Sequence, residues 1–101
     1  MAERKEVVWT ESALIEKHDI LYYWIQHNKS TVFSTKLNNE FDDAIDFICL
    51  HERCGVEIKE QVFRYLVREY QILYEITGHY IVILSIWDGR QDPEKLKQRL
   101  E

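Results

Sequence analysis

Apolar residues in the second quarter of the chain recur at steps of three and four, which is the spacing of one helix face. Ser30 precedes this stretch as a capping residue, and Leu50 is its last apolar position. The apolar stripe consists of Phe33, Leu37, Phe41, Ala44, Ile45 and Ile48. Acidic residues crowd the other side, so we predict an amphipathic helix from Ser30 to about Leu50 that buries this stripe.

A first helix is predicted from Thr10–Ser12, where hydroxyl side chains offer an N-cap, to about His27. Its predicted inner face holds four residues at helical spacing, with Trp24 beside them. These residues are Leu14, His18, Leu21 and Ile25. Because only two or three residues separate the two helices, we expect an antiparallel helical hairpin.

Strand patterns dominate the second half of the chain. The stretches Tyr70–Thr77 and Tyr80–Trp87 are rich in aromatic and β-branched residues, and Gly78-His79 between them is typical of a type II′ hairpin turn. The second stretch is apolar at both parities, which favours a central strand with helices on one side. Its other side then needs a cover, either a partner's amphipathic segment in an apolar groove or the chain's own last helix. The predicted groove consists of Tyr80, Ile81, Ile83 and Trp87.

The remaining elements complete an α+β domain over residues 1–101. We predict a first strand at Glu6–Trp9, on a sheet edge, and a further strand at Val62–Val67, which Arg68-Glu69 turns into the next. The stretch His51–Gln61 is predicted to be a loop. Pro93 favours a short terminal helix at Glu94–Leu100. The expected fold is therefore an N-terminal strand, an antiparallel helical hairpin and an antiparallel sheet ending in a three-stranded meander.

Composition narrows the classes of function. The chain has 13 Lys and Arg against 18 Asp and Glu, a net charge of −5 that weighs against strong phosphate-backbone binding and suits a basic partner segment. No apolar run approaches the roughly 20 residues that span a bilayer, so we expect a soluble, cytoplasmic protein without membrane contact. The segment Cys49–Cys54 lacks the four ligands of a structural zinc, and no Gly-rich or GxSxG motif is present. We therefore predict no metal and no cofactor.

Three segments near the C-terminus carry a resemblance to a known family. The strand YQILYEI, the strand ending ILSIWDGRQDP, and EKL beyond it follow a strand and a helical hairpin. In this order they resemble the RelE/ParE toxin superfamily of bacterial type II toxin–antitoxin modules, which includes plasmid stabilisation systems. The resemblance covers essentially the whole chain, and the DGRQDP ending is its most specific part.

The resemblance implies one of two activities. RelE-like toxins are described as cutting mRNA in the ribosomal A site with basic residues on the sheet and a C-terminal tyrosine, whereas ParE-like toxins inhibit DNA gyrase. Carried over to this chain, the basic residues of the sheet fall on Val62, Arg64 and Gln71, and the last-strand arginine falls on Arg90. The C-terminal tyrosine falls near Leu96. Because guanidinium stays protonated near neutral pH, neither arginine can serve as the base.

We therefore predict a ParE-like toxin that a cognate antitoxin neutralises and that inhibits gyrase. The alternatives are a ribosome-dependent mRNA endonuclease with Arg64 and Arg90 as catalytic candidates, and an inactive member that keeps only antitoxin binding. The candidate contacts to target or antitoxin are Arg64, Arg68, Trp87, Asp88, Arg90 and Asp92. Two structural alternatives stand beside them: a turn held by Asx hydrogen bonds around Arg90, and strand arginines paired with Glu60 or Glu69.

Overall fold

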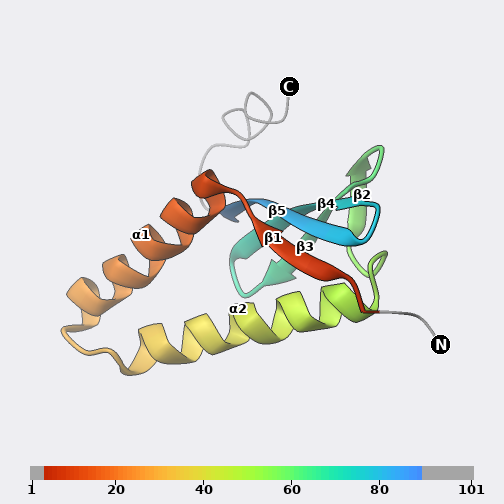
Figure 1. Ribbon diagram of the computed structural model, residues 1–101. Helices are drawn as coiled ribbons and strands as arrows, with labels where there is room; N and C mark the ends of the chain where they lie inside the picture. Colours follow the sequence, from red (N-terminus) through yellow and green to blue (C-terminus); the bar gives the residue numbers. More distant parts are fainter. Residues whose placement is uncertain (1–3, 90–101) are drawn as a thin grey trace.

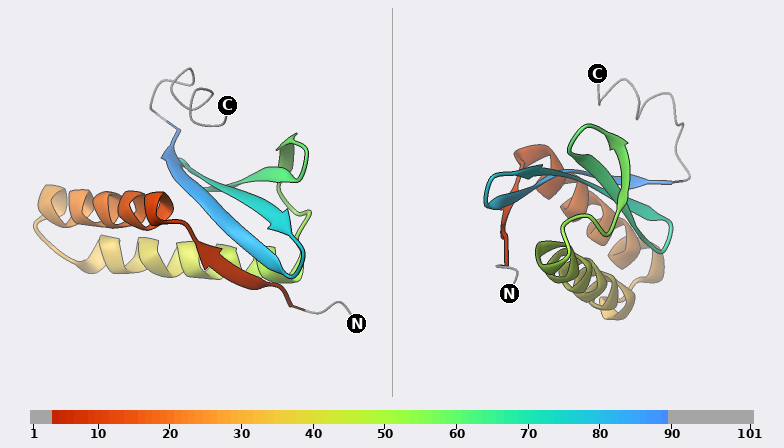
Figure 2. Two further views of the ribbon diagram at one scale, coloured as in Figure 1. Left: turned by 45° about the horizontal axis from the view of Figure 1, so that its top comes forward. Right: turned by 90° about the vertical axis from the view of Figure 1, so that its right-hand side faces the viewer.

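A computed structural model describes residues 4–89 and shows two helices packed on one face of a five-stranded sheet (Figures 1 and 2). The strand order across the sheet is β1-β5-β4-β3-β2. The elements are β1 (Glu6–Trp9), α1 (Glu11–Asn28), α2 (Val32–Leu50), β2 (Val56–Lys59), β3 (Val62–Val67), β4 (Tyr70–Thr77) and β5 (Tyr80–Asp88). The predicted α+β class, helical hairpin and C-terminal meander are confirmed. The terminal helix predicted at Glu94–Leu100 lies outside the described residues.

The sheet is mixed, whereas the sequence analysis predicted an antiparallel one. Strands β2 to β5 are antiparallel, but β1 runs parallel to β5, with Glu6 opposite Tyr80 and Trp9 opposite Ile83. Both helices and three strands separate β1 from β5, and such a long crossover permits parallel pairing, whereas a tight hairpin does not. The predicted edge position of β1 is confirmed.

Strand β2 is an element that the sequence analysis missed, because it predicted a loop over His51–Gln61. Residues Val56–Lys59 pair antiparallel with β3 at the other edge of the sheet. All four residues of β2 are exposed, so the strand has no buried face that alternation could reveal. Gln61 closes the β2–β3 turn with a φ of 63°, and its backbone N–H donates to Glu57 Oε2 at 3.2 Å.

Helix α1 buries a different face from the predicted one. Thr10 is its N-cap, because its Oγ1 accepts a hydrogen bond from the Ala13 N–H at 3.2 Å. Leu14 is 40% exposed and His18 is also exposed, so the predicted face is wrong at these two positions. The residues that pack against the core are Ala13, Ile20, Leu21 and Trp24.

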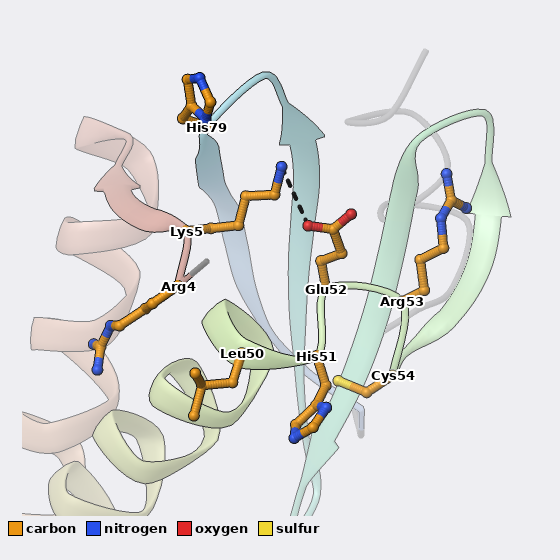
Figure 3. Close-up of a pocket in the computed structure, with 8 residues that line it drawn as sticks. All are labelled: Arg4, Lys5, Leu50, His51, Glu52, Arg53, Cys54 and His79. Atoms are coloured by element: carbon orange, nitrogen blue, oxygen red, sulfur yellow. Dashed lines mark ion pairs between the residues drawn. The ribbon is translucent and has the colours of Figure 1, made fainter. Parts of the chain in front are cut away.

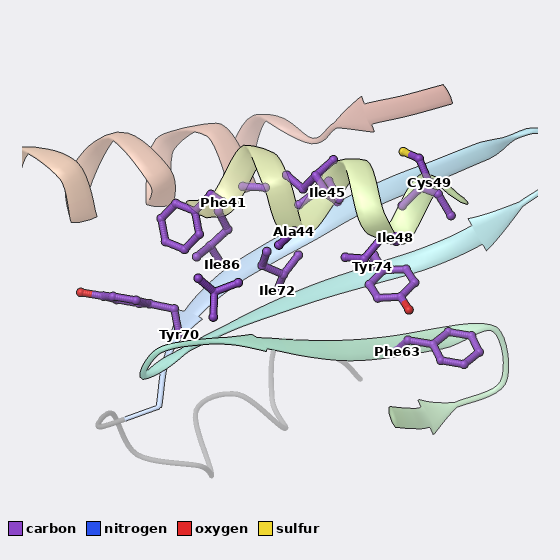
Figure 4. Packing of buried hydrophobic residues seen from close by; sticks show 14 of the residues in the cluster. Phe41, Ala44, Ile45, Ile48, Cys49, Phe63, Tyr70, Ile72, Tyr74 and Ile86 are labelled. Carbon is purple, nitrogen blue, oxygen red and sulfur yellow. The ribbon is translucent and has the colours of Figure 1, made fainter. Parts of the chain in front are cut away.

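The predicted stripe of α2 is confirmed, and the strands meet it with their own inner face (Figure 4). The helix begins at Val32 rather than at Ser30, whose Oγ accepts a hydrogen bond from the Val32 N–H at 3.2 Å. Alternate residues of β4, namely Tyr70, Ile72 and Tyr74, lie in the same core. These three residues therefore form part of the core beneath the helices.

A β-bulge in β5 explains why that strand is apolar at both parities. Leu73 pairs with Ser85 while the next residue, Tyr74, pairs with Ile83, so Leu84 is an extra residue in β5. The bulge shifts the alternation, and both Ile83 and Ile86 therefore reach the core under the helices.

The predicted apolar groove does not exist as one surface. Ile81 and Ile83 are fully buried in the core beneath the helices, whereas Tyr80 is 45% exposed. Trp87 is buried at the other end of β5, beyond the bulge. The grouping was wrong because it assumed one unbroken alternation along the strand.

Candidate functional site

A pocket of about 460 Å³ lies where α1 passes the C-terminal half of β5. Strand β1 pairs only with Tyr80–Ile83 of β5, so residues 84–88 extend beyond the β1 ladder and lie beside α1. We call this the acidic–aromatic pocket. Its lining residues are Glu16, Asp19, Ile20, Tyr23, Tyr70, Ile86, Trp87 and Asp88.

Helix α1 supplies half of the lining from a single face. Glu16, Asp19, Ile20 and Tyr23 are spaced at i, i+3, i+4 and i+7, which places them on consecutive turns of one helix face. None of these four residues was among the predicted site residues. Their helical spacing indicated that they share one face of α1. That face could be assigned to a pocket only once the structure showed that it lies beside residues 84–88 of β5.

Two hydrogen bonds fix the walls of the pocket. The Ser85 hydroxyl, which is 4% exposed, donates to the Glu16 carboxylate, with distances of 3.1 Å to Oε1 and 3.2 Å to Oε2. The Trp24 indole Nε1–H donates to the Tyr70 hydroxyl at 2.7 Å. Tyr70 also packs edge-on against Phe41 in the core, with ring centroids 5.7 Å apart. The pocket is therefore largely preorganised.

The chemistry of the lining favours a positively charged ligand group. Three of the eight lining residues are carboxylates, and three more are aromatic. Aromatic faces attract guanidinium and ammonium groups, and carboxylates accept charge-assisted hydrogen bonds from them. The arrangement can therefore bind a lysine or arginine side chain.

The face of the sheet opposite the helices carries Arg64. Arg64 pairs across the sheet with Leu73 on β4 and with Val56 on β2. Its side chain is half-buried, and its Nε is buried with no hydrogen-bond partner among the described residues. Leu66, two residues along the same strand, is 60% exposed. Arg64 therefore lies in largely apolar surroundings, and its cross-strand neighbour Leu73 is fully buried.

Arg68 has a partner within the chain. It occupies the β3–β4 turn with a φ of 56°, and its guanidinium donates to both oxygens of the Glu40 carboxylate at 2.9–3.1 Å. It also lies 5.2 Å from the centre of the Phe33 ring. The hydrogen bond from Arg68 lowers the pKa of Glu40, and the same bond raises the pKa of Arg68. The partner is on α2, not Glu60 or Glu69 as the sequence analysis considered.

The predicted site residues are thus distributed over several places. Trp87 and Asp88 meet in the acidic–aromatic pocket, whereas Arg64 and Arg68 lie on β3 and in the turn that follows it. Arg90 and Asp92 lie outside the described residues.

Tyr74 is sealed in the core and holds a loop. Its hydroxyl donates to the Glu52 carbonyl oxygen at 2.9 Å and accepts from the Gly55 N–H at 3.1 Å. Burial raises the pKa of Tyr74 above its ordinary value. Its side chain is fully buried, so its hydroxyl serves the α2–β2 loop rather than a solvent-facing site.

The described part of the chain holds neither a metal-binding cluster nor a membrane-spanning helix. Among residues 4–89, no group of three or more His, Cys, Asp or Glu side chains is arranged to hold a metal ion. Cys49 is a buried residue of α2, 1% exposed, and burial raises the pKa of its thiol. Neither described helix combines the length and apolar character needed to cross a membrane.

Comparison with known proteins gives the family. A search of curated proteins finds no match. Among solved structures, the chain is similar to a structure titled "Chromosomal ParDE TA system from P. aeruginosa", with a TM-score of 0.71 and 13% sequence identity over 86% of this chain and 98% of that one. The family model "ParE toxin of type II toxin-antitoxin system, parDE" matches residues 7–93. The chain therefore belongs to the ParE toxin family of type II toxin–antitoxin systems.

Proposed function

We propose that this toxin is neutralised by a cognate antitoxin and arrests growth by binding DNA gyrase, without cutting RNA. The ParE family assignment supports the antitoxin partner, and the resemblance to ParE toxins supports gyrase as the target. The acidic–aromatic pocket is the observation that carries the antitoxin part of the proposal, because it offers a defined, charged binding site for another polypeptide.

The chemistry of the sheet supports a non-hydrolytic toxin. Attack by an RNA 2′-hydroxyl needs a group that accepts its proton, and guanidinium groups are poor proton acceptors in general. Tyr74 is fully buried and its hydroxyl is engaged with backbone groups, so it cannot meet a substrate. Both facts weigh against the RelE type of reaction in the described part of the chain.

The pocket specifies the kind of antitoxin segment that it would bind. A basic side chain would enter between Asp19 and Asp88, with its apolar stem against Ile20 and its charged end against Trp87. The toxin's net charge of −5 would also attract a basic segment over longer distances. We therefore propose a lysine or arginine of the antitoxin as the occupant.

Three assays on the full chain separate the possible functions. Induction without antitoxin should arrest growth, whereas harmless expression would favour an inactive, antitoxin-binding member. Purified toxin should inhibit supercoiling by gyrase, and no inhibition at stoichiometric excess would refute the proposed target. Primer extension on translated mRNA should show no new A-site ends, because such ends would establish the RelE type of activity.

A pair of matched variants tests the pocket. Asp19→Asn with Asp88→Asn removes two charges and should weaken antitoxin binding about tenfold or more by calorimetry, with a smaller dependence on salt. Asp43→Asn is the control, because Asp43 is exposed on α2 and does not line the pocket. Equal affinities for the double variant and the control would show that the antitoxin binds elsewhere.

A further inference from the structure

A second cavity, of about 660 Å³, lies at the C-terminal end of α2 (Figure 3). Three segments far apart in the sequence form it: the residues before β1, the loop after α2, and the β4–β5 turn. We call it the basic cavity. Its lining residues are Arg4, Lys5, Leu50, His51, Glu52, Arg53, Cys54 and His79.

Hydrogen bonds hold the three segments of the basic cavity together. The Lys5 N–H donates to the Cys49 carbonyl oxygen at 3.0 Å, and the Glu6 N–H donates to the His79 carbonyl oxygen at 2.9 Å. The Lys5 ammonium bonds to the Gly78 carbonyl oxygen and forms an ion pair with Glu52 at 3.2 Å (Figure 3). The cavity is therefore a built feature of the fold rather than a chance gap between loops.

The charge of the basic cavity is opposite to that of the chain. Three cations, Arg4, Lys5 and Arg53, line the cavity with one carboxylate, Glu52, and two histidines. Figure 3 shows the Arg4 side chain pointing away from Glu52, and Arg4 pairs instead with Asp46, outside the lining. The whole chain carries −5, so cationic groups gather here against the general balance. Backbone N–H groups also bind the carbonyl oxygens of Phe47 and Cys49 at the end of α2, which limits the negative field of that helix terminus.

Arg53 is the cation best placed to meet a ligand. Arg4 is paired with Asp46 at 2.7 Å and Lys5 with Glu52 at 3.2 Å, whereas Arg53 takes no part in the ion pairs of the described residues. Its guanidinium lies 5.5 Å from the centre of the Phe63 ring, and Nη2 is 3.4 Å from Gln61 Oε1. These contacts orient the guanidinium without neutralising its charge.

We propose that the basic cavity binds the phosphate group of a small phosphomonoester. Its volume falls within the usual range for small-molecule sites, and Arg53 and Lys5 supply donors for phosphate oxygens, with His79 on the Lys5 side of the cavity (Figure 3). A long nucleic acid is a poorer fit, because its other phosphates would meet the acidic remainder of the surface. The proposal does not depend on the identity of the toxin's target.

Glu52 is the lining residue whose replacement tests phosphate binding most directly. This carboxylate already holds the Lys5 ammonium, so an incoming phosphate must share or take over that cation. Glu52 therefore acts as an internal competitor and limits affinity. Replacing it with the neutral, similarly shaped Gln should strengthen phosphate binding, which is the opposite of what loss of a contact residue does.

The experiment is an NMR titration of the full chain with adenosine 5′-monophosphate, inorganic phosphate and adenosine. We expect both phosphates, but not adenosine, to shift the backbone amides of residues 51–54 and 79. Glu52→Gln should tighten binding about fivefold, and Arg53→Gln should weaken it about fivefold. The control is Lys36→Gln, which removes a positive charge from exposed α2 surface outside the cavity and should leave affinity unchanged.

Several outcomes would overturn the proposal. These are shifts spread over the whole surface, equal affinities for the three variants, or weaker binding by Glu52→Gln. A poly-dT oligonucleotide that binds more tightly per phosphate than the monophosphate would identify the cavity as part of a nucleic-acid surface instead. Native amide spectra of all variants would exclude misfolding as the cause of any change.

Discussion

Replacing Tyr74 by Phe isolates the contribution of one buried hydroxyl. The hydroxyl donates to the Glu52 carbonyl oxygen at 2.9 Å, accepts from the Gly55 N–H at 3.1 Å and lies 3.9 Å from the Cys54 sulfur. The ring itself stacks on Phe63 with centroids 5.5 Å apart, and Phe preserves that contact. The substitution therefore removes polar contacts without opening a large cavity.

The expected loss of stability follows from the groups left behind. Without the hydroxyl, the Glu52 carbonyl and the Gly55 N–H lose their partner at the start of the α2–β2 loop. Leaving a buried polar group unsatisfied costs about 1–3 kcal/mol, so we expect a loss of about 2 kcal/mol. For a chain of this size that corresponds to a fall in Tm of about 10 °C.

The assay is urea unfolding of wild type and Tyr74→Phe, with Tyr80→Phe as the control. Tyr80 is 45% exposed on β5, so removal of its hydroxyl should change the free energy of unfolding by less than about 0.5 kcal/mol. If Tyr74→Phe were equally mild, the hydroxyl would not hold the loop and the reasoning would be refuted.

The same residue predicts a response to alkaline pH. Burial raises the pKa of Tyr74 in the folded protein above its ordinary value of 10.0. The unfolded chain therefore loses this proton first, and the stabilisation is complete below pH 10 and declines as pH rises above it. Tyr74→Phe should remove this part of the decline, which urea midpoints between pH 9 and pH 11 would reveal.

Three further substitutions test separate parts of the structure. Gly55→Ala places a Cβ 2.5 Å from a β3 carbonyl oxygen and should cost about 2 kcal/mol or more in urea unfolding. Arg68→Ala removes the ion pair with Glu40 but keeps a positive φ, so it should lower Tm more than Arg68→Gly does. The ion-pair contribution to the Tm of the wild type, relative to Arg68→Ala, should be lost as pH falls through the lowered pKa of Glu40. Ser85→Ala removes the hydrogen bond from the Ser85 hydroxyl to the Glu16 carboxylate and should weaken antitoxin binding in calorimetry with little change in Tm.

Local periodicity made much of the fold predictable. The α2 stripe and the β4–β5 hairpin were predicted because their signals lie within single elements: a step of three or four, and a glycine between two apolar runs. Gly78 adopts the predicted positive φ, at 54°. The face of α1 was mispredicted because apolar residues surround the helix, and Leu14, Tyr22 and Tyr23 remain exposed.

Only two of the eight residues that line the acidic–aromatic pocket were predicted as site residues, and the reason lies in the tertiary structure. Trp87 and Asp88 were identified from the strand ending that carries the family resemblance. The carboxylates of Glu16 and Asp19 lie at a pocket only because β1 stops pairing at Trp9. The sequence pattern does not predict at which residue of β5 that pairing ends.

One residue outside the acidic–aromatic pocket links the features that create it. Thr10 ends the β1 segment, caps α1, and donates its hydroxyl to the Ile83 carbonyl oxygen at 2.8 Å, next to the bulge at Leu84. The bulge in turn places buried Ser85 against Glu16 on α1. The helix start, the end of the β1 ladder and the change of parity in β5 therefore coincide at one point. Helix α1 begins where β1 stops pairing with β5, so the position of the pocket follows from the topology. The charge of the pocket depends largely on the α1 residues that lie beside that part of β5.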